Sequence, residues 1–202
     1  MNRKGLTYGA GIVDTPSEQI KNPDGTVSKD PIYAKWSDML MRCYSAKYQS
    51  KYPTYQGCFV CPEWLLFSNF KDWMKGRDWQ GLELDKDIII PGNKEYSPRT
   101  CALIPDWLNK FFSRPSFRAG DLPTGVSLVR RPNAWKYRAS LTAGGEQFHL
   151  GLFDSPDEAK RAYDIEKTKQ AYMRIGRYSL TPGHDKRVIA ALLARAETGH
   201  II

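Results

Sequence analysis

The chain has 202 residues, of which 41% are hydrophobic and 26% charged; this fits one large or two small domains and excludes a chain that is disordered throughout. No apolar stretch approaches the roughly 20 residues of a membrane span, which excludes a transmembrane helix. The formal net charge of +8 favours a polyanionic partner, nucleic acid before an anionic membrane surface.

The first third of the chain predicts an arm followed by two helices. Residues 1–32 are rich in Gly, Pro, Asn and Asp, which is typical of turns and short extended pieces and predicts an N-terminal arm outside the core. From Tyr33 onward, apolar residues recur at the i, i+3, i+4 and i+7 positions of a helix, at Trp36, Met39, Leu40 and Cys43. A second helix is expected over 62–75, with Pro62 at its start.

The segment 82–90 alternates polar and apolar residues and then becomes wholly apolar before a Pro-Gly turn, which predicts a strand. In a strand, Glu83, Asp85 and Asp87 point to the same side. Three carboxylates there repel one another unless a cation or basic side chains lie between them. The segment is therefore a candidate metal site.

A linker is expected at 113–122, because Pro and Gly interrupt either structural period there. Beyond it, three strands are expected at 125–129, 135–142 and 147–153, and a helix is expected from Ser155 to about Arg174. Ser155, the following Pro and Glu158 form a capping box. A last helix is expected at 187–197. Its apolar residues need a partner surface, either on its own domain or in a homodimer formed through the tail 181–202.

The second half contains four motifs in a recognisable order and spacing: Gly125-Val126, Trp135 to Ala139, Leu150 to Asp154 and Glu158 to Asp164. On these residues, the segment from about 123 to 174 resembles the APETALA-2/ethylene-response-factor DNA-binding domain, which also occurs in phage and bacterial integrases and homing endonucleases. The domain is taken as 123–180. It implies a three-stranded antiparallel sheet backed by one helix, with the sheet lying in the major groove of double-stranded DNA.

Strand alternation supports this resemblance independently, because it places Val126, Leu128, Ala139, Leu141, Phe148 and Leu150 toward the helix and leaves a polar, partly basic row outside. Arg can read guanine and Gln can read adenine, whereas Lys and turn arginines mostly hold phosphates. Ser127 and Val129 stand where the family carries arginines, so its base specificity does not transfer. The candidate DNA-binding residues are Arg130, Arg131, Trp135, Lys136, Arg138, Thr142, Gln147 and His149.

The first half contains a second set of motifs: Tyr33 to Cys43, Val60 to Trp64, Leu84 to Asp87 and Gly92 to Cys101. On this set, residues 33–112 resemble the HNH (His-Me finger) homing endonucleases of phages. In that family, an Asp and the last motif residue hold one divalent cation, and a His deprotonates the attacking water. The implied fold class is α+β, with a degenerate HNH or ββα-metal module ahead of the C-terminal sheet and helix.

This chain departs from the HNH pattern at two positions. Asp85 matches the metal-binding Asp and Asn93 the middle Asn, but Lys86 replaces the His base and Thr100 the final ligand. Two hypotheses follow. Either the module cleaves DNA with Mg²⁺ or Mn²⁺ held by Asp85 and Asp87, with Lys86 steadying the phosphate, or it binds DNA without cutting it.

The cysteines suggest a second metal. Cys58 and Cys61 form a CxxC pair, and together with Cys43 and Cys101 they could hold a structural Zn²⁺. The outer two cysteines also fall on predicted apolar faces, where a free Cys is common as a small hydrophobe. Both interpretations stay open.

The sequence thus predicts a DNA-binding protein of phage or mobile-element origin, a homing or nicking endonuclease in the cytoplasm of the bacterial host. The cytoplasmic location follows from the absence of an apolar leader after the first residues. The alternative is a catalytically inactive DNA-binding or host-interaction protein. An RNA-binding function is a third possibility, because Tyr44, Tyr48, Tyr52 and Tyr55 could stack on bases if exposed.

Overall fold

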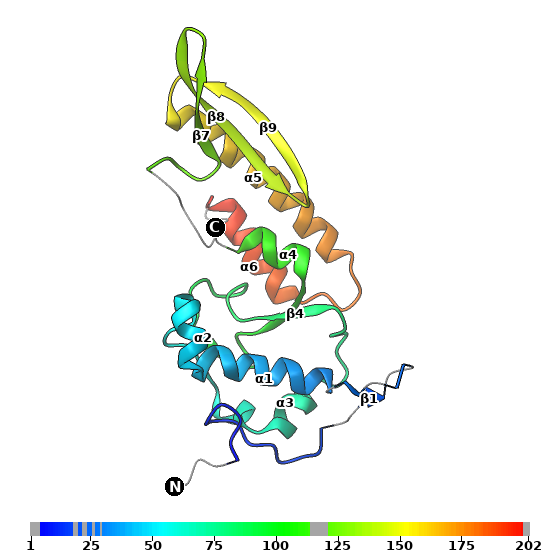
Figure 1. Ribbon diagram of the computed structural model, residues 1–202. Coiled ribbons are helices and arrows are strands. Elements are labelled where there is room, and N and C mark those ends of the chain that lie inside the picture. Colours follow the sequence, from blue (N-terminus) through cyan, green and yellow to red (C-terminus); the bar gives the residue numbers. More distant parts are fainter. Residues whose placement is uncertain are drawn as a thin grey trace. The chain divides into compact units, whose positions relative to one another are not determined.

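The computed structural model describes residues 5–17, 20–21, 24–25, 27–28, 30–113 and 121–199 (Figure 1). The chain divides into two compact units, Met1–Leu103 and Ile104–Ile202. Both contain helices and strands, so the α+β class predicted from the sequence is confirmed.

The first unit is mainly helical, with short strand pairs. Its helices are α1 (Pro31–Tyr44), α2 (Ala46–Lys51), the 3-10 turns η1 (Pro53–Tyr55) and η2 (Pro62–Leu65), and α3 (Phe67–Met74). Its strands are β1 (Ile20–Lys21), β2 (Val27–Ser28), β3 (Phe59–Val60), β4 (Leu82–Asp85) and β5 (Glu95–Tyr96). β1 pairs with β2, β3 with β5 in parallel, and β4 with β6 (Ala102–Pro105), the strand at which this unit ends.

Helix α1 confirms the first predicted helix. The Asp30 side chain caps its N-terminus by accepting hydrogen bonds from Ile32 N and Tyr33 N, and Pro31 occupies the first turn, where no N–H is needed. The predicted apolar stripe is buried, and its Trp36 donates an indole hydrogen bond of 2.7 Å to Trp64 O. This face forms the centre of the unit's aromatic core.

The expected helix over 62–75 is divided into η2 and α3 at Leu66, which is extended. The reason is a long-range pairing with the N-terminal segment: Ile12 N donates to Leu65 O at 2.8 Å, and Phe67 N donates to Ile12 O at 3.0 Å. These bonds take the place of helical ones. The described part of the expected arm is therefore packed onto the unit at this point, and Gly11 is buried.

The second unit contains the three-stranded antiparallel sheet predicted from the sequence. β7 (Val126–Arg131), β8 (Ala134–Ala143) and β9 (Glu146–Phe153) lie in that order and pack against α5 (Pro156–Ser179), which Ser155 caps as expected (Figure 1). Ala139 and Leu141 on β8 and Ala159 and Tyr163 on α5 are buried. Gly125, with φ +80°, allows the chain to pass against the Tyr163 ring.

A further helix packs against α5. α6 (Lys186–Glu197) is capped by Asp185 and buries Val188, Leu192 and Ala196, so its apolar stripe is covered within the unit. The homodimer through this tail stays a prediction.

The boundary between the units precedes the expected linker at 113–122, of which residues 114–120 lie outside the described residues. Helix α4 (Asp106–Phe112), expected in the first module, belongs to the second unit. Its aromatic end holds it there, because the Phe111 carbonyl accepts a 2.8 Å hydrogen bond from Lys167 Nζ on α5.

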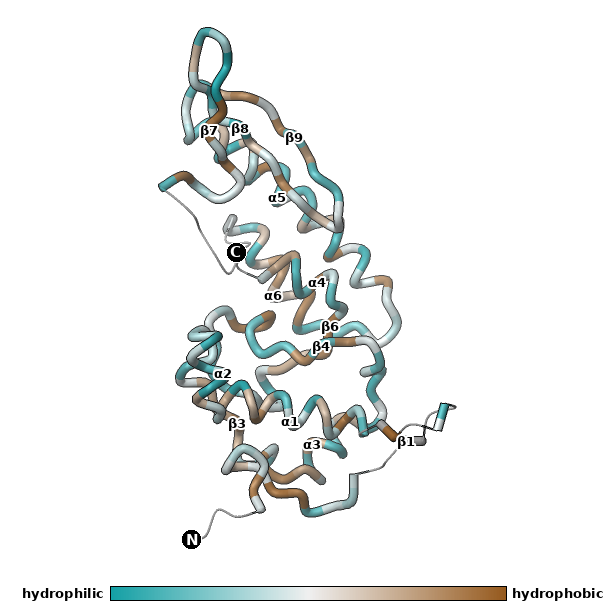
Figure 2. The backbone as a smooth tube through the Cα atoms, in the orientation of Figure 1, coloured by the Kyte–Doolittle hydropathy of each residue, from teal (hydrophilic) through white to brown (hydrophobic). Residues whose placement is uncertain are grey.

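No helix in the described ranges has the length and apolar character that crossing a bilayer requires. Hydrophobic and hydrophilic residues are interspersed along the helices and strands of both units (Figure 2).

Candidate nucleic-acid interface

The sheet face that points away from α5 gathers six of the eight predicted DNA-binding residues. The register sets Ser127 opposite Arg138 and Thr142 opposite Gln147, and side chains of cross-strand partners share a face. With the alternation along each strand, the outer face contains Arg131, Lys136, Arg138, Thr142, Gln147 and His149.

The other two candidates, Arg130 and Trp135, lie on the opposite face of the sheet. They are cross-strand partners, and the Arg130 guanidinium lies 5.6 Å from the centroid of the Trp135 ring. Trp135 is 56% exposed and Leu128, on the same side, is 45% exposed. The end of the β7–β8 hairpin is thus not covered by α5, so Leu128 does not reach the core as the alternation predicted.

The outer row carries basic groups that are available to a ligand. Arg138 Nε donates a 3.3 Å hydrogen bond to Ser127 Oγ, and Lys136 forms an ion pair with Asp154. Within the described residues, no carboxylate oxygen lies within 4.0 Å of the guanidinium of Arg131 or Arg138. The Gln147 amide and the His149 ring stand exposed on β9 beside them.

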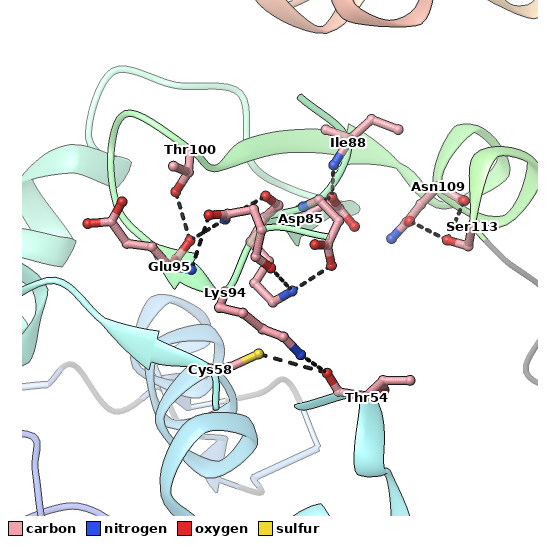
Figure 3. A network of polar contacts seen from close by, with 12 residues as sticks. Thr54, Cys58, Asp85, Ile88, Lys94, Glu95, Thr100, Asn109 and Ser113 are labelled. Carbon is pink, nitrogen blue, oxygen red and sulfur yellow. Dashed lines mark hydrogen bonds and ion pairs between the residues drawn. The ribbon is translucent and has the colours of Figure 1, made fainter. Parts of the chain in front are cut away.

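The predicted catalytic residues form a closed polar network in the first unit, part of which Figure 3 shows. β4 ends at Asp85, whose Oδ1 accepts hydrogen bonds from Asp87 N at 2.7 Å and Ile88 N at 2.6 Å. This turn bends the chain at Lys86. The expected strand through residue 90 is therefore wrong, because β4 ends at Asp85.

Burial raises the pKa of Asp85, although the two backbone hydrogen bonds oppose the shift. Both amide donors point at one carboxylate oxygen, so the group serves as a cap for the turn. Among the residues that the structure describes, no three His, Cys, Asp or Glu side chains gather in a way that could hold a metal ion. The divalent-cation site expected at Asp85 and Asp87 stays a prediction.

Lys86 and Asn93 hold the two sides of the loop together. The buried Lys86 ammonium donates to Asp87 Oδ2 at 2.6 Å and to Asn93 O at 2.7 Å. The Asn93 amide donates to Lys86 O and to Glu95 O, and its oxygen accepts from Glu95 N. Thr100, also buried, donates its hydroxyl hydrogen bond to Glu95 O at 2.8 Å.

The network thus brings Asp85, Lys86, Asp87 and Asn93 together, with Thr100 joined through Glu95. Each of these side chains is engaged through at least one polar atom with another of them or with the backbone, and a Lys with two acceptors already in place is poorly arranged to take a proton from water. The arrangement can hold the loop between β4 and β5 in one conformation, and we call this set of hydrogen bonds the clamp.

The four cysteines are free and buried in the aromatic core of the first unit. Burial raises the pKa of Cys43 and Cys101 to about 12 and that of Cys61 to about 11, so these side chains are neutral thiols at neutral pH. No three of these four described side chains form a metal-binding group. Their arrangement is that of small core residues.

The tyrosines considered for base stacking contact one another. Tyr48 lies 4.7 Å from Tyr52 and 5.7 Å from Tyr55, measured between ring centroids. Only Tyr52 of the set is exposed, at 39%, while the hydroxyl of Tyr44 accepts a hydrogen bond from Val60 N. The set does not form an open stacking platform.

A basic stripe on α5 was missed by the sequence reasoning. Lys167, Gln170, Arg174 and Arg177 follow the spacing i, i+3, i+7 and i+10, which places them on one side of a helix. That spacing was visible in the sequence, but nothing in it indicated that α4 would pack alongside.

Comparisons of the chain with protein-family models, with curated proteins and with solved structures give no match. The two family resemblances therefore remain predictions that rest on the motifs themselves.

Proposed function

We propose that the protein binds double-stranded DNA through the outer face of the β7–β8–β9 sheet. The observation that carries the proposal is the row of exposed polar and basic side chains on that face, opposite a face that packs against α5. A narrow β-ribbon fits the major groove of B-DNA, where base edges present distinct donor and acceptor patterns.

The chemistry of the row suggests a division of roles. Arg138 can donate two parallel hydrogen bonds to a guanine, and Gln147 can pair with an adenine edge. Arg131 and Lys136, nearer the end of the hairpin, suit phosphate contacts that fix the register without reading sequence. Affinity should then fall steeply as salt rises.

For the first unit, the arrangement favours DNA binding without strand cleavage over the metal-dependent endonuclease. The supporting observation is the set of internal hydrogen bonds that engages Asp85, Lys86 and Asn93. Among the described residues, no three His, Cys, Asp or Glu side chains gather to hold Mg²⁺ or Mn²⁺, and Asp85 uses one of its two carboxylate oxygens to cap the turn. Cleavage by a homing or nicking endonuclease is the rival hypothesis.

Binding is tested by fluorescence anisotropy with a pool of random duplexes, using Arg138→Gln and, as control, Arg161→Gln on the exposed side of α5. We expect the sheet variant to lose affinity and the control to keep it. Equal affinity of the two variants would refute the assigned face, and preferred binding of single-stranded RNA in competition would favour the RNA alternative.

Cleavage is tested on supercoiled plasmid with Mg²⁺ or Mn²⁺, with EDTA and Asp87→Ala as controls. Asp87 is half-exposed, so its removal leaves the Asp85 turn in place. We expect a gel shift and intact plasmid. Nicking that EDTA and Asp87→Ala both abolish would overturn the noncatalytic assignment.

A further inference from the structure

The second unit contains a groove of about 740 Å³ between α4, α5 and the β8–β9 turn. Its charged lining consists of four basic side chains and one carboxylate: Lys110, Lys167, Arg174, Arg177 and Asp106. Asp106 is already paired with Lys110 at 2.7 Å. The remaining three cations give the groove a strongly positive character.

These cations are held in place by rings and backbone instead of by counterions. Lys167 Nζ lies 3.6 Å from the Phe111 ring centroid, and the Arg174 guanidinium lies 4.4 Å from it. Arg177 stacks over Trp107 at 4.7 Å. Such stacking orients a cation while leaving N–H donors free for another acceptor.

Counterions are scarce at this point. In the described ranges, no carboxylate oxygen lies within 4.0 Å of the charged nitrogens of Lys167, Arg174 or Arg177. Burial and then the neighbouring charge of Arg177 lower the pKa of Arg174, and the charge of Glu146 at the neighbouring turn opposes that shift without an ion pair. Gln170 Oε1 accepts a 2.5 Å hydrogen bond from Arg174. Lys167 is 6% exposed and has the Phe111 carbonyl as its hydrogen-bond acceptor.

The groove is continuous with the proposed DNA-binding face. Thr142 belongs to the outer row and also lines the groove, and its cross-strand partner is Gln147. Gly144 and Gly145 at the β8–β9 turn form the wall, and a Cβ atom added to Gly144 would lie 3.3 Å from a terminal nitrogen of Arg174. The turn therefore approaches the cations closely enough to share an anion with them.

We infer that the α4–α5 groove is a second anchoring site, which binds a backbone phosphate of the duplex held by the sheet through Arg174 and Arg177, beside Lys167. This inference rests on the proposed function. A phosphodiester suits the groove because its oxygens can accept from both guanidinium groups, and Arg binds phosphate in a two-pronged geometry.

The test compares salt dependence of duplex affinity in the full chain, the double variant Arg174→Gln with Arg177→Gln, and Arg161→Gln as matched control. Arg161 carries the same charge on the same helix but does not line the groove, and it lies 13 residues before Arg174, on nearly the opposite side. Circular dichroism and thermal melting establish that each variant folds.

We expect the double variant to reduce the slope of log affinity against log salt by about 1, because one phosphate contact is lost, while Arg161→Gln leaves it unchanged. An unchanged slope with weakened binding in Arg138→Gln would overturn the groove and leave the proposed function standing. Failure of the unmodified chain to bind duplex at all would overturn both.

A titration with inorganic phosphate tests whether the groove binds a free phosphate ion or a phosphate of the duplex backbone. The backbone amide signals of Gly144 and Gly145 in a ¹H–¹⁵N spectrum report occupancy of the groove. We expect them to shift with duplex and to respond only weakly to inorganic phosphate. Saturation by inorganic phosphate, together with a normal salt slope in the double variant, would make the groove a small-anion site and overturn the inference.

Discussion

Lys86 and Asn93 exchange reciprocal hydrogen bonds: the Lys86 ammonium donates to Asn93 O at 2.7 Å, and the Asn93 amide donates to Lys86 O at 2.9 Å. The two residues sit where an HNH-like motif would place its base and its middle Asn. Their pairing closes the loop between β4 and β5 from both sides. This relationship makes stability, more than catalysis, the property that depends on them.

The first prediction is that Asn93→Ala destabilises the first unit by about 1–3 kcal/mol, because Lys86 O and Glu95 N lose the Asn93 side chain and Glu95 O keeps only its hydrogen bond from Thr100. Chemical denaturation followed by tryptophan fluorescence measures the change. Arg99→Ala is the control, since the Arg99 side chain is 79% exposed and the loss of its ion pair with Glu95 should cost at most about 1 kcal/mol. If Asn93→Ala is as stable as the control, the side chain is free for a ligand and the clamp is refuted.

The second prediction concerns pH. Burial holds the pKa of Asp85 above its ordinary value in the folded chain. The native state then keeps this proton at pH values where the unfolded chain, with an Asp pKa of about 3.9, has released it, so stability falls as pH rises through that window. The loss is complete above the folded pKa.

Asp85→Asn tests this assignment because an amide oxygen can accept the same two backbone hydrogen bonds without a charge. The difference in unfolding free energy between the unmodified chain and Asp85→Asn should move against the unmodified chain as pH rises from about 4. Urea denaturation over a pH series measures it. A constant difference across the series would mean that Asp85 is not desolvated in the folded protein.

Sequence patterns predicted correctly those helices and strands that depend mainly on neighbouring residues in the chain. The stripe at Trp36, Met39 and Leu40 predicted α1, and the alternation along β8 and β9 predicted which side chains face outward. Both patterns are direct consequences of helix and strand geometry. The capping box at Ser155 likewise fixed the start of α5.

The features that the sequence did not predict depend on long-range contacts or on side-chain hydrogen bonds. The break at Leu66 depends on Ile12, which is 54 residues away, and no window of sequence around Leu66 contains that information. Asp85 ends β4 because its own side chain bonds the following amides, a choice that competes with strand pairing. The exposure of Leu128 and Trp135 depends on how far the hairpin extends past α5, which periodicity does not encode.

The third prediction separates two costs of a glycine substitution in the second unit. Gly125 and Gly145 both have positive φ, at +80° and +84°, but a Cβ atom on Gly125 would lie 2.0 Å from Tyr163 Cδ2, whereas Gly145 has nothing within 4 Å. Gly145→Ala should cost about 1–2 kcal/mol from backbone strain alone. Gly125→Ala should cost about 1–3 kcal/mol more because the Tyr163 ring must move.

Thermal melting of the two alanine variants measures this difference. Equal destabilisation would mean that Tyr163 relaxes freely and does not fix the packing of the sheet on α5. A larger loss in Gly125→Ala would support a tightly packed junction between β7 and the helix.

The last prediction uses Lys167 as a reporter of the groove. Burial, and then the neighbouring charges of Arg174 and Arg195, lower the pKa of Lys167 to about 8. The unfolded chain binds this proton up to its ordinary pKa of about 10.4, so the native state binds fewer protons in between and stability rises with pH from about 8 to about 10.4. Lys167→Met should abolish that rise, although it leaves Phe111 O without its donor at every pH.

Bound phosphate stabilises the charged form of Lys167, so saturation with duplex should shift the start of the rise in stability to higher pH in the unmodified chain and not in the Arg174→Gln, Arg177→Gln variant. A pH profile that is the same in the unmodified chain and in Lys167→Met would show that the ammonium is solvated, and the groove would then be too open to hold its cations in place.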